Sequence, residues 1–173
     1  MNKLFLAIML LATTFTFAAI IPVNYAGTWT LDTKQSKYLP ENLPNVNSVK
    51  LYVTQDNKVL KVVDETKFNG QEEVFKQTDV YNLDGTESTK PTEVKKGDGT
   101  LKIPATRKLV VAADGKLKLI KARGFQTSNG GGFIITQVED WTLSADGKTL
   151  TVHHVNQMDG AKKEEYEMVF VKE

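Results

Sequence analysis

The chain contains only two arginines, Arg107 and Arg123, and both lie in segments where apolar and polar residues alternate. Because side chains point alternately to the two faces of a β-strand, each arginine shares a face with its apolar neighbours. These neighbours are Leu101, Ile103, Leu109 and Val111 for Arg107, and Leu117, Leu119 and Phe125, together with Lys121, for Arg123. A buried guanidinium needs hydrogen-bonding partners, because an unpaired charge in a protein interior is very costly. The sequence therefore predicts either internal ion pairs or an anion-binding site.

Three later segments also carry polar side chains among apolar ones. Gln137 and Glu139 alternate with Phe133, Ile135, Trp141 and Leu143, His154 follows Leu150 and Val152, and Tyr166 precedes Met168 and Phe170. If these faces meet in one interior, they form a candidate ligand site made of Arg107, Arg123, Glu139, His154, Tyr166, Trp141 and Phe125.

Three interpretations of this set remain open. In the first, Arg123 pairs with Glu139 on the neighbouring strand, and the polar network simply fills the interior. In the second, an arginine, aided by His154 or Tyr166, binds a ligand carboxylate or phosphate through paired hydrogen bonds. In the third, a β-bulge reverses the alternation and places both arginines outside.

Other kinds of site find little support in the sequence. The absence of cysteine excludes disulfides, cysteine zinc sites and thiol nucleophiles. His153 and His154 are adjacent on a predicted strand, so they face opposite sides and cannot share a metal ion. No G-x-S-x-G nucleophile motif occurs, and no helix or lysine follows the glycine run at 130–132. We therefore expect no metal, no cofactor and no catalytic residues. Acid–base catalysis by Glu139 and His154 is a weaker alternative.

Turn residues define the elements that must position these side chains. Seven of the twelve glycines follow Asn or Asp directly, and from Asn69 to Asp159 these pairs recur every 13 to 17 residues. Such dipeptides favour the tight turns of β-hairpins, and the segments between them alternate and are rich in Val, Ile, Thr, Phe and Tyr. The predicted strands are 26–32, 48–55, 58–68, 72–83, 87–95, 101–113, 116–126, 133–143, 148–157 and 162–172.

Long strands joined by hairpins predict an all-β, antiparallel up-and-down meander. The two edges of an open meander would promote aggregation, so we expect it to close into a barrel of about eight to ten strands. The long crossover connections of a Greek-key sandwich are missing. Lysines on both faces of the strands leave no charge-free band for lipid, and this favours a soluble barrel.

The first 18 residues resemble a secretory signal peptide rather than part of the fold. Lys3 precedes an apolar run, and Thr16-Phe17-Ala18 offers small residues for cleavage after Ala18. The alternative is an uncleaved anchor, because Leu4–Ile21 is just long enough to cross a bilayer. Removal of Lys3 leaves 21 basic and 21 acidic side chains, a balance without the basic excess of nucleic-acid-binding proteins. We expect a periplasmic or secreted single domain at 19–173 that does not span the membrane after processing.

Gly27-Thr28-Trp29, at the start of the first predicted strand, resembles the G-x-W motif of the lipocalins. In that family the glycine and tryptophan close the floor of an up-and-down barrel, a role that the resemblance assigns to Gly27 and Trp29. Lipocalins also pack an arginine from near the last strand on this tryptophan, but 162–172 contains none. The helix expected after the eighth strand is missing as well. The chain is therefore lipocalin-like in a broad sense.

The resemblance implies that the barrel binds a small hydrophobic or amphipathic molecule, such as a fatty acid or isoprenoid, with Arg107 or Arg123 holding its polar head. The alternative is an envelope interaction or structural protein with a packed lumen. Such a protein would bind a macromolecular partner through loops 33–47 and 127–132, and it would expose Leu39, Leu43 and Val46 together.

Overall fold

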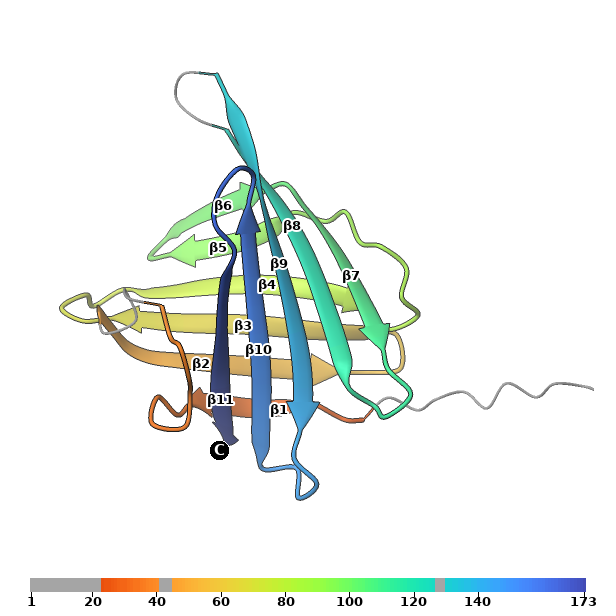
Figure 1. Cartoon of the computed structure of the whole chain (residues 1–173). Helices are drawn as coiled ribbons and strands as arrows, with labels where there is room; N and C mark the ends of the chain where they lie inside the picture. Colours follow the sequence, from red (N-terminus) through yellow and green to blue (C-terminus); the bar gives the residue numbers. More distant parts are fainter. Residues whose placement is uncertain (1–22, 41–44, 127–129) are drawn as a thin grey trace, which may run out of the picture.

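The computed structural model describes residues 23–40, 45–126 and 130–173 and consists of antiparallel β-structure (Figure 1). The predicted signal segment and loop residues 41–44 and 127–129 lie outside the described residues. The strands are β1 (Gly27–Leu31), β2 (Val46–Gln55), β3 (Val59–Phe68), β4 (Val74–Asn82), β5 (Thr92–Lys96), β6 (Gly99–Ile103), β7 (Ala105–Val111), β8 (Leu117–Gln126), β9 (Gly132–Leu143), β10 (Thr149–Met158) and β11 (Glu164–Lys172). Within the described residues, no helix is long and apolar enough to cross a membrane.

The strands form one sheet that curls into a nearly closed barrel, which confirms the predicted architecture. The sheet order is β6-β5-β4-β3-β2-β1-β11-β10-β9-β8-β7, so the first and last strands of the chain pair with each other. Trp29 lies opposite Lys172 in this pairing. The free edges of the sheet therefore belong to β6 and β7, which are neighbours in the sequence.

Pro104 separates β6 from β7 and explains why the structure has eleven strands where ten ranges were predicted. The predicted strand 101–113 is interrupted there, because proline has no N–H to donate to a sheet ladder. Ile103, next to Pro104, is buried as predicted, but Leu101 is 61% exposed, so its predicted place in the interior is wrong.

The seam between the two sheet edges is bridged by Ser88. Its backbone N–H and C=O both bond to Arg107 of β7, each at 2.8 Å. Ser88 is the one residue of the predicted strand 87–95 that forms an isolated bridge, and β5 begins only at Thr92. The residues between them, which include Pro91, carry the chain from the seam into the β5–β6 hairpin.

The hairpins follow the predicted turn chemistry closely. Six of the seven glycines that follow Asn or Asp have positive φ, whereas at the β5–β6 turn Gly97 adopts it in place of Gly99. The alternation is also kept at the arginines. Arg107 is 1% exposed and Arg123 lies half-buried, so no bulge turns them outward.

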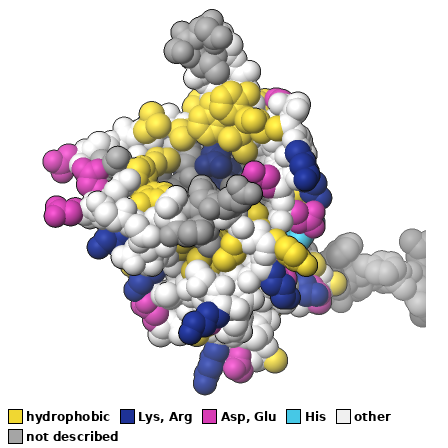
Figure 2. Space-filling view, turned by 60° about the vertical axis from the view of Figure 1, so that its left-hand side comes forward, with side chains coloured by type: hydrophobic (Ala, Val, Ile, Leu, Met, Phe, Trp, Pro, Cys, Tyr) yellow, Lys and Arg dark blue, Asp and Glu magenta, His cyan; other side chains and the backbone are white. Residues whose placement is uncertain are grey.

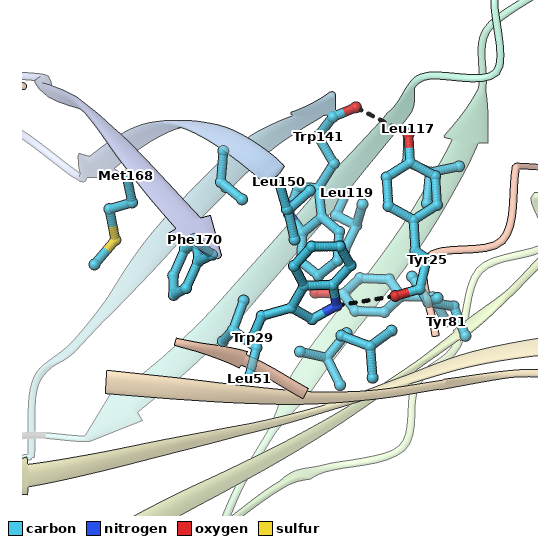
Figure 3. Close-up of a cluster of buried hydrophobic side chains, with 14 of the residues drawn as sticks. Tyr25, Trp29, Leu51, Tyr81, Leu117, Leu119, Trp141, Leu150, Met168 and Phe170 are labelled. Atoms are coloured by element: carbon cyan, nitrogen blue, oxygen red, sulfur yellow. Dashed lines mark hydrogen bonds between the residues drawn. The ribbon is translucent and has the colours of Figure 1, made fainter. Parts of the chain in front are cut away.

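One end of the barrel is closed by aromatic side chains (Figure 3). Trp29 is fully buried, and its indole Nε1 donates to the backbone carbonyl of Tyr25 at 3.0 Å. The Tyr25 hydroxyl in turn donates to the carbonyl of Gly115 at 3.1 Å. The Tyr25 ring packs at a tilt against the ring of Trp141. The Lys172 ammonium lies 5.1 Å from the centre of the Trp29 ring. A lysine of the last strand therefore makes the cation–π contact with this tryptophan, at the place where lipocalins have an arginine.

Candidate functional site

A cavity of about 180 Å³ lies inside the barrel above the aromatic floor. We call it the chamber. Its walls come from β2, β3, β4, β8, β9, β10 and β11. The apolar lining residues are Val46, Val49, Leu51, Val62, Tyr81, Leu119, Trp141, Val152, Met168 and Phe170, and the polar ones are Asp64, Thr66, Gln77, Asp79, Lys121, Gln137, Glu139, His154 and Tyr166. The chamber is therefore amphipathic.

Arg107 belongs to a buried ion cluster at the seam. Its Nε and a terminal nitrogen contact Oδ1 of Asp79, both at 2.6 Å. The remaining guanidinium hydrogen bonds go to the Thr92 hydroxyl and the carbonyl oxygen of Lys90. Lys121 donates to the other Asp79 oxygen at 2.7 Å. Each of the three guanidinium nitrogens of Arg107 thus has a partner within the protein. The side chain is only 1% exposed, so it is not placed to hold a ligand head group.

The charges around Asp79 decide its ionisation. Burial alone would raise the pKa of this carboxyl, but the Lys121 ammonium and the Arg107 guanidinium hold it at about 2. Asp79 is therefore ionised at neutral pH and neutralises two cations of the barrel interior.

Arg123 has no carboxylate partner within the described part of the chain, so the predicted pair with Glu139 is wrong. Its terminal nitrogens donate to the amide oxygens of Gln77 at 3.0 Å and Gln137 at 3.5 Å. Its Nε is buried and lacks a hydrogen-bond partner among the described residues. The arginine spans from β8 to β4 because Gln77 faces it across the barrel, a contact that adjacent-strand pairing could not predict.

Glu139 is held by other groups. It accepts hydrogen bonds from Nε1 of Trp141 and from Nε2 of Gln137, both at 2.7 Å. The His154 ring nitrogen Nδ1 lies 3.6 Å from the carboxylate, and the ring stacks on Tyr166 with centroids 4.7 Å apart. Burial lowers the pKa of His154 in spite of Glu139, so the imidazole is neutral at pH 7.

A second hollow, of about 310 Å³, lies next to the chamber on the side away from the aromatic floor. We call it the mouth pocket, and Arg123, Ile135, Asn156, Met158, Ala161, Lys162 and Glu164 line it. Arg123 and Asn156 of the mouth pocket donate hydrogen bonds to Gln137 and Tyr166 of the chamber, so the linings of the two spaces are in direct contact.

The structure thus divides the seven predicted site residues among four places. Glu139, His154, Tyr166 and Trp141 line the chamber, Arg123 lines the mouth pocket, and Arg107 lies behind Asp79. Phe125 stacks on Phe133 beside an apolar surface groove that Leu101, Ile103, Pro104 and Ile134 also line. Figure 2 shows hydrophobic side chains gathered on this face.

The chamber also contains polar residues that the sequence interpretation did not select, above all Asp64 and Asp79. The sequence does indicate that both aspartates face inward, because Asp64 alternates in phase with Leu60 and Val62, and Asp79 with Tyr81. Of the loop residues expected to form a docking surface, Leu39 and Val46 pack against the core. Leu43 lies outside the described residues.

Asp64, in the chamber wall, makes the stability of the folded protein depend on pH. Burial raises the pKa of this carboxyl to about 6 from 3.8, so the folded protein binds the proton more tightly than the unfolded chain. Its ionisation therefore reduces stability progressively as pH rises from about 4 to about 6. We expect Asp64→Asn to be more stable than the wild type by about 1–3 kcal/mol at pH 7.5 and equally stable at pH 3.5.

Urea denaturation of both proteins across this pH range checks the expectation. Asp79 and the exposed carboxylates contribute equally to the pH dependence of both proteins, so their contributions cancel in the difference between the two free energies of unfolding. If the variant is less stable than the wild type at pH 7.5, the expectation is wrong, because the folded protein then stabilises the ionised form of Asp64.

Comparisons with known proteins assign no family to this barrel: the chain matches no protein-family model, and no curated protein sequence gives a significant match.

Proposed function

We propose that this protein binds a small amphipathic molecule inside its barrel, with the apolar part in the chamber and the polar head toward the mouth pocket. The observation that carries the proposal is the chamber itself, a space inside the barrel that both apolar and polar side chains line. Binding sites for small molecules combine these features. The lipocalin-like G-x-W segment at the barrel floor supports the same role. The proposed activity is binding, without catalysis.

The size of the chamber favours a compact ligand. An engineered apolar cavity of about 150 Å³ in another protein binds benzene, and the chamber measures about 180 Å³. It therefore suits a single ring or a short branched chain. A fatty acid or isoprenoid of greater length would have to extend into the mouth pocket.

Of the two arginines, Arg123 is the one suited to hold the polar head. Arg107 is buried and bonds to Asp79, Thr92 and Lys90. Within the described part of the chain, Arg123 hydrogen-bonds only to neutral amides and its Nε has no partner. A ligand anion would form a charge-assisted hydrogen bond there, which is stronger than a bond to an amide oxygen.

Filling the chamber tests the proposal. We expect Val62→Phe to weaken small-molecule binding by about tenfold or more, because the added ring occupies the space that the ligand would take. The measurement is quenching of tryptophan fluorescence on titration with aromatic and short-chain acids and alcohols, supported by native mass spectrometry of freshly purified protein. Val110→Phe is the matched control, because Val110 is 44% exposed on β7.

Circular dichroism establishes that each variant is folded, and Val46→Phe, at the edge of the chamber, replaces Val62→Phe if the latter is not. A wild-type protein that retains no small molecule and responds to none of the probes would contradict the proposed function. So would equal binding by the chamber-filled variant and the control.

We also propose export, with removal of residues 1–18 and release into the periplasm or the medium. Expression of the full sequence in a bacterial host should then yield, outside the cytoplasm, a protein whose intact mass begins at Ala19. Recovery of the full 19.3 kDa chain in the cytosol or membrane fraction would contradict the proposal.

A further inference from the structure

We infer that the mouth pocket recognises a 2-hydroxy acid, that is, a carboxylate with a hydroxyl on the neighbouring carbon. This inference rests on the proposed function and specifies the polar head of its ligand. It follows from two residues that line the same pocket, Arg123 and Asn156. Each has one buried polar atom, Nε and Oδ1 respectively, that lacks a partner among the described residues.

The two atoms have opposite requirements. The Nε–H of Arg123 is a donor that needs an acceptor, whereas the amide oxygen of Asn156 is an acceptor that needs a donor. Buried polar groups without partners are rare in folded proteins, because each loses its hydrogen bonds to water. A ligand group that accepts one bond and donates another would satisfy both atoms at once.

Charge identifies the acceptor of that group as an anion. Among the described residues, the guanidinium of Arg123 hydrogen-bonds only to the neutral amides of Gln77 and Gln137. Its other contact is with the ring of Phe125, whereas Arg107 has the carboxylate of Asp79. The other charged residues of the pocket, Lys162 and Glu164, are exposed at its rim and have opposite signs. The positive charge of Arg123 therefore dominates the buried part, and a carboxylate is its natural partner.

The donor must be a separate, neutral group. A carboxylate accepts hydrogen bonds but donates none, so it cannot serve Oδ1 of Asn156. The other end of this amide is fixed, because Nδ2 donates to the Tyr166 hydroxyl at 3.2 Å. An ammonium would be repelled by Arg123, whereas a hydroxyl carries no charge. Ile135 and Met158 supply apolar contacts for the carbon skeleton.

Three probes of similar size separate these contributions. Mandelate carries the ring, the carboxylate and the hydroxyl, phenylacetate lacks the hydroxyl, and 1-phenylethane-1,2-diol lacks the carboxylate. We expect the wild-type protein to bind mandelate about tenfold or more tightly than either of the others, measured by calorimetry or tryptophan quenching.

Two variants assign the preference to the named atoms. Arg123→Gln should lower affinity for mandelate and phenylacetate by about tenfold or more and leave the diol unchanged. Asn156→Leu should lower mandelate affinity to the level of phenylacetate, which itself stays unchanged. Lys162→Gln, at the exposed rim of the same pocket, is the matched control and should change each affinity by less than about threefold.

Equal wild-type binding of mandelate and phenylacetate would overturn the inference, and this comparison needs no variant to fold. A parallel loss of both acids in Asn156→Leu would overturn it too. If other probes bind in the chamber but none of the three does, the inference fails and the proposed function stands. If no probe of any kind binds, both fail.

Discussion

Asp79→Asn is expected to lower the free energy of unfolding by about 3–5 kcal/mol, because it leaves two buried cations without their common counter-ion. Arg107 is 1% exposed and Lys121 is 4% exposed, and both contact this one carboxylate. An asparagine in the same place could still accept hydrogen bonds but would carry no charge. For a barrel of this size the loss corresponds to a fall in Tm of about 10 °C.

Urea denaturation at pH 7 measures the effect, with Asp140→Asn as the matched control. Asp140 pairs with Lys118 at 2.9 Å, but both side chains are more than two-fifths exposed, so the control should lose no more than about 1 kcal/mol. A similar small loss in Asp79→Asn would mean that the buried cations are not held by the carboxylate.

The pH dependence of the same cluster has a defined sign. The pKa of Asp79 is about 2 in the folded protein, below its ordinary value of 3.8. Its stabilising contribution is therefore complete above about pH 4 and is lost as pH falls towards 2. The wild-type protein should lose this contribution on acidification, and Asp79→Asn should not.

Trp29→Ala is the second substitution with a large expected effect, a loss of about 3–5 kcal/mol. The indole is completely buried at the barrel floor and bonds to the Tyr25 carbonyl. It also lies on β1, the strand through which β2 and β11 are joined. Removing it leaves a cavity where the first and last strands pair, and it frees the Tyr25 segment that covers the floor.

Thermal unfolding followed by far-UV circular dichroism measures this effect, since the variant has lost one of its two tryptophans. Trp29→Phe is the control, because it keeps most of the apolar volume while losing the hydrogen bond, and it should be clearly less destabilised. Lys172→Met removes only the cation near the ring and should cost at most about 1 kcal/mol. If Trp29→Ala and Trp29→Phe melt at the same temperature, packing at the floor is not what stabilises the closure.

Much of the fold could be read from local patterns. The dipeptides of Asn or Asp with Gly marked most hairpins, because their backbone conformations satisfy tight turns without help from the rest of the chain. Strict alternation placed Arg107 and Arg123 on the inner face, since side-chain direction in a strand depends only on position within that strand. Alternation did not predict the exposure of Leu101, which keeps the phase of buried Ile103 but lies closer to the turn of the β5–β6 hairpin.

The partners of the inner polar residues could not be read in this way. Asp79 meets Arg107, 28 residues away, and Lys121, 42 residues away, because the barrel closes between the Ser88 segment and β7. Arg123 likewise reaches Gln77 across the barrel rather than Glu139 on the neighbouring strand.

The sequence by itself therefore determined that the chain forms an antiparallel meander and which side chains of most strands face inward, because both follow from local backbone geometry. Only the tertiary structure decided which arginine is neutralised and which keeps a free donor. That outcome depends on where the sheet closes and on contacts across the lumen, and neither is encoded by any one segment of the chain.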